Sequence, residues 1–443
     1  MATPVVPPLD IPTGWRPVSD ILPMGQDTHI DSQYDWLVVG AGITGLSSAR
    51  RLAELRPDDR ILLVDARPVG WGASGRNSGF LIDLPHKFDF ENPEPQRLKK
   101  IVQLNREAIA GLKGLVEKHA IPCDWHETGK LQGAVKSRGT GMLRSFSAAL
   151  DALQEPYEEL DRDGCFAIMG TRYYAGAVYT RGSVLVDPFA LVRGLAKSLP
   201  SNVDLADDTA VTWFKPEGSG FQATLSQCIG HVREVRATKV ILATDPFTPT
   251  FGYLKNRIVP AVTFASITRP LTDAEWKGYE GRKNWGLTPA DAGGTTLRMA
   301  DGGRLLIRNH YAHAPNYKIR DSDLDKARIA HREGIDKRFP QFAHIPITST
   351  WGGVVSLSGN HVAYFGEIAS GVYSAGCYGG VGMVRGAMSG KLLAELATGQ
   401  ESSQLEDMME VSGKPSLLPP DPLRDIGVRA RLRLAAWESK EEK

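Results

Sequence analysis

Residues 38–45, VVGAGITG, constrain the fold of this chain more than any other segment. A short apolar run leads into three glycines, Gly40, Gly42 and Gly45, which lead into a sequence with the apolar spacing of a helix. In a strand that turns sharply into a helix, the first glycine permits the turn, the second lets the backbone approach a pyrophosphate, and the third allows close helix-to-strand packing. Free N–H groups at the helix start bind the phosphates. The segment therefore predicts a dinucleotide-binding unit.

A second apolar strand, RILLVDAR at 60–67, completes this unit. It ends in Asp65, about twenty residues after the glycines, where a carboxylate accepts hydrogen bonds from ribose hydroxyls. Strand, glycines, helix, second strand and terminal acid all occur in order, so ordinary turn glycines are a weak alternative. The unit alone does not separate FAD from NAD.

Three further segments favour FAD. The first is GWGASGRNSGF at 70–80, a run of small residues with polar donors, where a nicotinamide-binding domain would continue into a plain helix. The second is KVILATDPFTP at 239–249, an apolar strand ending in small residues. The alternative for residues 70–80 is a surface loop, and the alternative for residues 239–249 is an ordinary core strand.

The third segment is a strand that reaches Ala375, followed by a glycine-rich loop and a helix that ends at Gly399. The dipole and free N–H groups of such a helix would stabilise the negative charge of a reduced flavin. Gly386 and Gly390, four residues apart, give this helix one smooth face for close packing. A loop that serves packing alone is the alternative.

Length and composition limit the remaining functions. The chain has 443 residues, 42% of them hydrophobic, which predicts two domains. A formal charge of +1 leaves no field to attract nucleic acid. Four cysteines lie far apart without a CxxC spacing, which argues against a disulfide framework and predicts no metal site. We also expect a reducing compartment.

The N-terminal stretch has no basic start and no apolar run of signal-peptide length, and it contains many prolines. We interpret residues 1–33 as an arm on the surface. No segment reaches the roughly 18 unbroken apolar residues that span a bilayer. The expectation is a soluble, cytoplasmic protein.

With these motifs in place, the chain resembles the D-amino-acid oxidase superfamily of FAD-dependent oxidoreductases over about residues 35–399. The resemblance is carried by VVGAGITGLSSA with Asp65, GASGRNSGF, VDPFALVRGLA, KVILATDPFTP, WGGVVSLSGNHVAYFGE and AGCYGGVGMVRG. Among the subfamilies, GASGRNSGF and the WGG segment are most similar to the γ-glutamylputrescine oxidase branch.

The resemblance implies an α/β (α+β) fold with two domains and the flavin at their interface. The Rossmann-like FAD-binding domain would be assembled from discontinuous segments, 34–84, 184–257 and 345–412. The substrate domain, with an antiparallel or mixed sheet and helices, would comprise 85–183 and 258–344. Residues 413–443 would form a C-terminal tail helix.

The resemblance also assigns the residues that would line FAD. They are Gly40, Ala41, Gly42, Ile43, Thr44, Gly45, Asp65, Ala66, Arg67, Ala73, Ser74, Gly75, Arg76, Asn77, Ser78, Gly79, Val211, Ala243, Thr244, Gly379, Gly380, Val381, Gly382 and Met383. Sarcosine oxidases attach their flavin through a cysteine where this chain has Trp351. The nearby thiol of Cys377 lies in the loop beyond, so noncovalent FAD is expected.

The implied reaction is oxidation of a carbon–nitrogen bond by hydride transfer to flavin N5, with O2 then reduced to H2O2. Relatives that oxidise α-amino acids often bind the carboxylate with an arginine just before the segment matching SLSGNHVAYFG; here that neighbourhood reads TWGGVV. An amine, such as a γ-glutamyl amine, is therefore favoured over a simple α-amino acid. The alternatives are a dehydrogenase that passes electrons to a quinone or carrier protein, and a non-catalytic flavin-binding assembly protein.

Four side chains are candidates for the substrate pocket: Trp351, Tyr378, Arg308 and His310. Aromatic rings could enclose the amine, and Arg308 could bind a distal carboxylate. Three of them have a structural alternative: Trp351 as a core residue, Arg308 as an ion-pair partner and His310 as a satisfied edge residue. No acid–base pair stands out, which suits a reaction whose chemistry belongs to the flavin.

The tail places Leu423, Ile426, Ala430, Leu434 and Trp437 at helical spacing, with arginines elsewhere around the helix. Such a helix could rest on anionic lipid. The alternative, which we favour at this point, is a terminal helix docked on its own domain. The sequence leaves the oligomeric state open.

Overall fold

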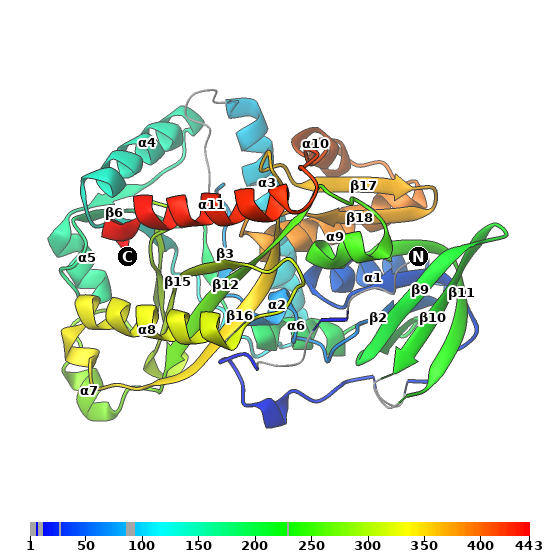
Figure 1. Ribbon diagram of the computed structural model, residues 1–443, viewed down its shortest axis with the longest axis horizontal. Helices are drawn as coiled ribbons and strands as arrows, with labels where there is room; N and C mark the ends of the chain where they lie inside the picture. The colour runs from blue at the N-terminus through cyan, green and yellow to red at the C-terminus, as the bar shows by residue number, and fades with distance from the viewer. Residues whose placement is uncertain (1–5, 8–11, 26–27, 86–93, 228–229) are drawn as a thin grey trace.

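The computed structural model describes residues 6–7, 12–25, 28–85, 94–227 and 230–443. Two large sheets lie in separate halves of the molecule, each with its own helices (Figure 1). The predicted α/β fold with two domains is confirmed. Among the described residues, no helix combines the length and apolar character needed to cross a membrane.

The first sheet has the strand order β17-β18-β11-β1-β2-β8, with a β9–β10 hairpin added beside β11. Its central strands are parallel, and β17 and the hairpin are antiparallel. The strands are β1 (Gln33–Val39), β2 (Ile61–Val64), β8 (Val203–Ala206), β9 (Thr209–Glu217), β10 (Gly220–Gln227), β11 (Val232–Leu242), β17 (Tyr364–Ala369) and β18 (Val372–Gly376). Strands from the start, middle and end of the chain therefore form one sheet, as the discontinuous domain requires.

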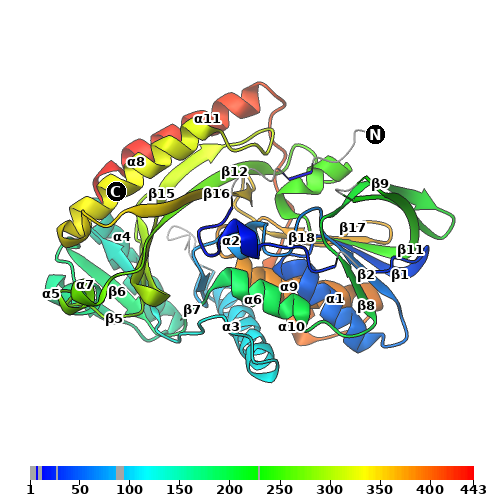
Figure 2. The same ribbon diagram turned by 90° about the horizontal axis from the view of Figure 1, so that it is seen from below.

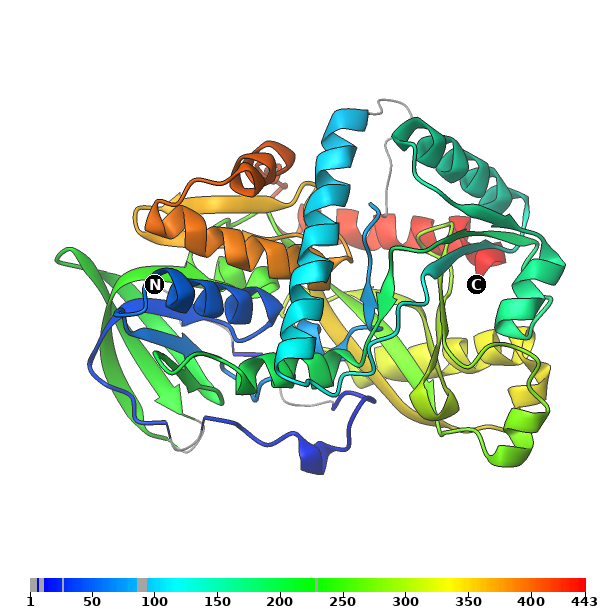
Figure 3. The same cartoon turned by 180° about the vertical axis from the view of Figure 1, so that it is seen from behind.

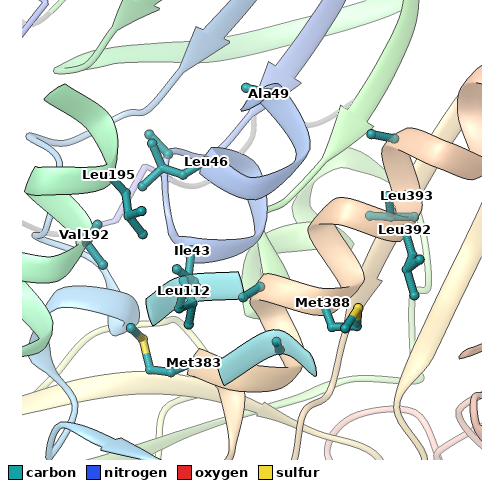
Figure 4. Packing of buried hydrophobic residues seen from close by; sticks show 14 of the residues in the cluster. Ile43, Leu46, Ala49, Leu112, Val192, Leu195, Met383, Met388, Leu392 and Leu393 are labelled. Atoms are coloured by element: carbon teal, nitrogen blue, oxygen red, sulfur yellow. The ribbon is translucent and has the colours of Figure 1, made fainter. Parts of the chain in front are cut away.

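Helices cover one face of this sheet and bury its largest apolar cluster (Figures 3 and 4). The cluster includes Ile43, Leu46, Leu112, Val192 and Leu392. Burying such side chains is worth about 1.5–3 kcal/mol each. The helices are α1 (Ile43–Leu55), α3 (Pro95–Lys118), α6 (Pro188–Lys197), α9 (Gly382–Thr398) and α10 (Ser403–Val411).

The close contact of α1 and α9 depends on two small residues of α9. A Cβ at Gly390 would overlap the carbonyl oxygen of Thr44, and one at Gly386 would lie 2.8 Å from the Thr44 hydroxyl oxygen. These are the glycines of the expected smooth face, and that face packs on α1. The first and last parts of the cofactor domain are thereby joined directly.

The second sheet has the order β16-β12-β15-β14-β13-β4-β6-β5 and is antiparallel except for the pair β13–β4. Its strands are β4 (Lys130–Ala134), β5 (Glu158–Leu160), β6 (Gly176–Thr180), β12 (Val259–Thr268), β13 (Trp285–Pro289), β14 (Thr296–Ala300), β15 (Arg304–His313) and β16 (Ile347–Leu357). Figure 2 shows α8 (Asp321–Arg338) and α11 (Leu423–Glu438) on the outer side of this sheet, with the first domain on the other side. The remaining α-helices and strands of the described residues are α2 (Ala73–Arg76), α4 (Ser137–Leu153), α5 (Arg162–Met169), α7 (Asp273–Lys277), and the short pair β3 (Phe80–Leu81) and β7 (Val184–Leu185). Short 3-10 helices lie at Val18–Asp20, Asp245–Phe251, Asp301–Gly303, Pro340–Phe342 and Lys440–Glu442.

Two elements pack with the sheet of the other predicted domain. Helix α3 falls within the limits 85–183 of the substrate domain but packs in the apolar cluster of the first sheet. The segment 345–412 was expected to belong to the FAD-binding domain, but its first strand, β16, pairs with β12 along nearly its whole length in the second sheet. Strand pairing of this kind is non-local, so no pattern within 347–357 distinguishes the two sheets. The domain limits stay a prediction, and we propose to count β16 with the substrate domain.

Candidate active site

A cavity of about 350 Å³ lies where the two sheets meet. Most of the predicted cofactor residues line it, although they come from six separate segments of the chain. They are Gly40, Gly42, Ile43, Thr44, Asp65, Ala66, Arg67, Ala73, Ser74, Arg76, Asn77, Ser78, Val211, Ala243, Thr244, Gly379, Gly380, Gly382 and Met383.

The glycine turn at the end of β1 has the geometry that its spacing predicts. Gly40 has φ +103°, a conformation that side-chain-bearing residues avoid, and its N–H donates to the Val64 carbonyl oxygen at 2.7 Å. A Cβ at Gly45 would overlap the carbonyl oxygen of Gly40. The N-terminus of α1 can therefore approach the strand closely and face the cavity.

Asp65 directly follows β2, half-buried beside the glycine turn. One carboxylate oxygen accepts from the Ala41 N–H at 2.7 Å, and the other accepts from the Arg67 N–H at 2.9 Å. Burial raises the pKa of Asp65 to about 6, against the lowering effect of these two hydrogen bonds. The carboxylate therefore stabilises the turn and presents its remaining acceptor positions at the cavity.

The loop after β2 is held by its own side chains. The Asn77 amide donates to the Ser74 carbonyl oxygen at 2.8 Å, and its oxygen accepts from the Gly79 N–H at 2.8 Å. Arg76 donates to the carbonyl oxygens of Trp71 (2.7 Å) and Gly352 (2.6 Å), the latter in β16. The loop is thus fixed to the second sheet.

The second glycine loop joins β18 to α9. Gly379 and Gly380 have φ of +65° and +93°, and Gly382 and Met383 begin α9 at the cavity. The residue at the N-cap, Val381, has no side-chain oxygen to occupy the first N–H groups of the helix. These N–H groups and the helix dipole are therefore available to a ligand with partial negative charge.

Five predicted cofactor residues are absent from the lining and support it from behind. They are Ala41, Gly45, Gly75, Gly79 and Val381. A Cβ at Gly75 would overlap the Gly70 carbonyl oxygen, and one at Gly79 would overlap both Arg298 and the Val186 carbonyl oxygen. Their small size lets the loop fold against its neighbours.

Three of the four pocket candidates line the cavity: Arg308, Trp351 and Tyr378. Half-buried Arg308 donates to the Thr296 hydroxyl at 3.0 Å and the Tyr311 hydroxyl at 2.9 Å. None of the ion pairs found among the described residues includes it. The Trp351 indole N–H donates to the Arg76 carbonyl oxygen at 2.8 Å, and the Tyr378 hydroxyl lies 3.1 Å from the Thr44 hydroxyl.

His310, the fourth candidate, lies outside the lining. The register of β12 and β15 shifts between Phe264 and Ser266, so side-chain alternation is interrupted after Arg308. His310 then packs on Phe264, with ring centroids 5.4 Å apart, and Phe264 belongs to an apolar cluster with Ala327 of α8. The bulge therefore turns this histidine toward the outer face of the sheet.

Several lining residues had no sequence signal. Thr263 and Ala265 of β12, with Thr288 and Thr296, form the wall that the second sheet contributes, and Val6 and Pro7 of the N-terminal arm reach the opposite end. The Arg67 guanidinium donates to the Pro7 carbonyl oxygen at 2.5 Å. Only the three-dimensional pairing of distant segments brings these residues to one cavity.

Asp245 is a second half-buried carboxyl in the lining. It has φ +41°, and it accepts from the Cys377 N–H at 3.0 Å and from the Ser356 hydroxyl. Burial raises the pKa of Asp245. Because Ser356 lies in β16 and Cys377 follows β18, this carboxyl joins the two sheets at the cavity.

The lining fits a flavin dinucleotide. Its elements are an acid after the second strand, two helix N-termini that face the cavity, and positive-φ glycines that allow close backbone approach. In the part of the chain that the structure describes, no cluster of three or more His, Cys, Asp or Glu side chains could hold a metal ion.

Comparisons with known proteins agree with this fit. A sequence model of the FAD dependent oxidoreductase family matches residues 35–396. The probable oxidoreductase OrdL of Haemophilus influenzae is 25% identical over 407 residues, which cover 86% of this chain and 85% of the relative. The gamma-glutamylputrescine oxidoreductase of Escherichia coli is 25% identical over 381 residues, which cover 82% and 84%.

A solved structure shows the same fold. Glycine oxidase from Geobacillus kaustophilus superposes with a TM-score of 0.70 at 19% sequence identity, covering 84% of this chain and 96% of its own.

Proposed function

This chain belongs to the FAD dependent oxidoreductase family, and we propose that it oxidises the carbon–nitrogen bond of an amine that carries a carboxylate away from the reacting carbon. When bound, FAD supplies the redox chemistry by accepting two electrons from that bond. The predicted cofactor residues that line the cavity would hold it there noncovalently. The Cys377 thiol does not line the cavity, and burial raises its pKa to about 12, which favours the protonated sulfur.

The observation that carries the substrate class is the environment of Arg308. Its guanidinium lies in the cavity wall with two hydroxyl partners and, within the described residues, no carboxylate partner. A guanidinium in a largely apolar cavity gains most from a bidentate carboxylate. The substrate would supply that anion.

The protein's contribution is orientation and exclusion of water. Arg308 would bind the distal carboxylate, while Trp351 and Tyr378 would form apolar walls around the amine. The unoccupied N–H groups at the start of α9 would stabilise negative charge on the cofactor's pyrimidine edge. Positioning of this kind lowers the barrier without an acid–base pair.

Candidate substrates follow from the required separation of amine and carboxylate. One relative is named a gamma-glutamylputrescine oxidoreductase. A γ-glutamyl amine has its free carboxylate at the end of the molecule opposite the reacting amine, so this class comes first. O2 is the proposed electron acceptor, which would be reduced to H2O2.

The test is the visible spectrum of the purified holoenzyme, followed anaerobically while γ-glutamyl amines, simple polyamines and amino acids are added in turn. We expect γ-glutamyl amines to bleach the flavin band, and air to restore it with release of H2O2. If a quinone restores the flavin band and air does not, the electron acceptor is a quinone and not O2. Bleaching by unsubstituted polyamines alone would contradict the role of Arg308, and a flavin that no amine reduces would contradict the amine oxidase.

A further inference from the structure

Helix α11 docks on the outer face of the second sheet through one side and through its end (Figure 2). Asp425 lies 2.9 Å from His313 of β15, and the Ser439 hydroxyl donates to Asp291 at 2.6 Å. Buried Glu442 accepts from the N–H groups of Val135 and Lys136 at 2.7 and 2.8 Å, directly before α4. The helix therefore has a fixed orientation.

The opposite side of α11 is an exposed apolar row. Leu423, Ile426, Ala430, Leu434 and Trp437 follow one another at intervals of three or four residues, which aligns them along one side of a helix. The large side chains of the row are exposed by 64%, 60%, 46% and 66%, in chain order. The helix therefore docks on its own domain, as we expected. The side that docks is, however, opposite to the apolar row that the sequence predicted.

Such a row is unusual on a protein surface, where large apolar side chains are normally exposed singly. Elsewhere in the described residues the exposed large hydrophobics are spread over the chain, for example Ile329 of α8. On α11 four of them occur within sixteen residues. In Figure 1 the helix crosses the front of the molecule, and the contact of Asp425 with His313 turns one of its sides toward β15.

Arginines flank the apolar row. With 3.6 residues per turn, Arg429 and Arg433 lie along one side of the row and Arg431 along the other. Both acidic side chains of the helix are neutralised: Asp425 pairs with Arg429 at 2.9 Å, and Glu438 lies 3.9 Å from Arg431. Arg433 has no acidic partner among the ion pairs of the described residues.

A second, smaller cavity of about 200 Å³ opens at the start of the same helix. Its basic lining residues are Lys255 and Arg424, and no acidic side chain lines it. His313 also lines it, and burial lowers the pKa of this histidine. Arg424 also pairs with Asp421 and donates to the Asn256 side chain at 3.0 Å. The row therefore begins beside a basic concave site of a size suited to an anionic head group.

From this arrangement we infer that α11 is a membrane-docking surface, which lies on bilayers that contain anionic phospholipid. The apolar row enters the head-group boundary, Trp437 occupies the interfacial position that tryptophan favours, and the flanking arginines meet lipid phosphates. A second copy of the chain fits less well, because a two-fold contact along the row would bring Arg429, Arg431 and Arg433 against one another.

The test is co-sedimentation of the full-length holoenzyme with vesicles. One vesicle type is phosphatidylcholine alone, and the other is phosphatidylcholine and phosphatidylglycerol in roughly equal parts. We expect binding to the anionic vesicles only, and weaker binding at high salt. The double variant Ile426→Gln/Trp437→Gln should lower the partition coefficient about tenfold or more, and Arg433→Glu should lower it about tenfold.

The matched control is Ile329→Gln, which removes an apolar side chain 61% exposed on α8 and should leave binding unchanged. The flavin spectrum and the melting temperature report that each variant is folded. Equal sedimentation of wild type and variants, or no sedimentation of the wild type, would overturn the inference. So would a wild-type dimer in lipid-free buffer that Ile426→Gln/Trp437→Gln converts to a monomer, because a second copy would then cover the row.

Discussion

The indole N–H of Trp15 donates to the carbonyl oxygen of Asn77 at 2.9 Å, so the N-terminal arm is bonded to a loop that lines the cavity. The guanidinium of Arg298 lies 5.1 Å from the centroid of the same indole, and Arg298 also donates to the Ser78 carbonyl oxygen at 3.2 Å. The arm therefore helps to hold the loop in place.

Replacing Trp15 should weaken FAD binding without touching the cofactor. Trp15→Phe keeps an aromatic ring and loses one hydrogen bond, worth about 0.5–1.5 kcal/mol, so we expect a rise of roughly threefold to tenfold in the dissociation constant of FAD. Trp15→Ala also leaves a cavity, and its effect should be larger. Titration of apoprotein with FAD measures both. Trp437→Ala, at a position 66% exposed, is the matched control, and a Trp15→Ala protein that binds FAD as the wild type does would refute the role of the arm.

Gly45→Ala should weaken cofactor binding by roughly five- to a hundredfold. The new Cβ would overlap the carbonyl oxygen of Gly40, so α1 must move away from the turn, at a cost of about 1–3 kcal/mol. Gly111→Ala is the matched control, because a Cβ there meets nothing within 4 Å and the residue lies inside α3. The control should be more stable than wild type by about 0.5–1 kcal/mol. Flavin content and denaturant unfolding distinguish the two, and equal flavin content would contradict the close-packing argument.

Arg308→Ala should raise the KM for a γ-glutamyl amine by roughly ten- to a hundredfold, because a charged hydrogen bond to the substrate is worth about 1.5–3 kcal/mol. Arg308→Lys should recover part of this loss, since it keeps the charge but not the two-pronged geometry. Steady-state kinetics on the same amine with its carboxylate converted to an amide provides the control. A variant that raises both KM values equally would show that Arg308 shapes the cavity and does not bind the anion.

His331 should make stability depend on pH. It is buried, lies 2.7 Å from the Ser266 hydroxyl and accepts from the Asn309 N–H at 3.3 Å, and burial lowers the pKa of His331 to about 3 from its usual 6.5. Between those values the unfolded chain binds a proton that the folded chain does not. The free energy of unfolding should therefore fall as pH decreases through this range, by up to about 1.4 kcal/mol per pH unit from this group.

Denaturant unfolding of wild type and His331→Asn at a series of pH values measures this contribution. We expect the wild-type curve to fall more steeply toward acid than the variant curve, with His331→Gln as a second variant should the first be poorly folded. Parallel curves would show that His331 titrates alike in the folded and unfolded chains.

The cofactor half of the site could be predicted because its chemistry is local. Gly40, Gly45 and Asp65 lie within one strand–turn–helix–strand unit, where neighbouring residues determine backbone conformation and close contacts. The lining around Gly379 could also be predicted, because a strand, a glycine loop and a helix follow each other in the sequence without interruption.

The substrate half could not be predicted in the same way. Thr263 and Thr296 reach the cavity only through the pairing of β12, β15 and β14, and no local pattern specifies that pairing. His310 has the spacing of a pocket residue relative to Arg308, but a bulge against β12 turns it outward. The helical spacing of the sequence predicted the apolar row of α11 along one side of a helix. Periodicity alone does not tell which side of that helix packs on the protein.

The position of β11 between β1 and β18 has a consequence for synthesis of the protein. On the ribosome, the glycine turn after β1 emerges early, but the strand that completes its sheet and the helix that faces the cavity emerge only near the end of translation. Contacts of such large sequence separation form slowly and late. A nascent chain therefore lacks β18 and the second helix N-terminus of the cavity until residues around Gly382 have left the exit tunnel, and the edge of β11 that pairs with β18 is open until then.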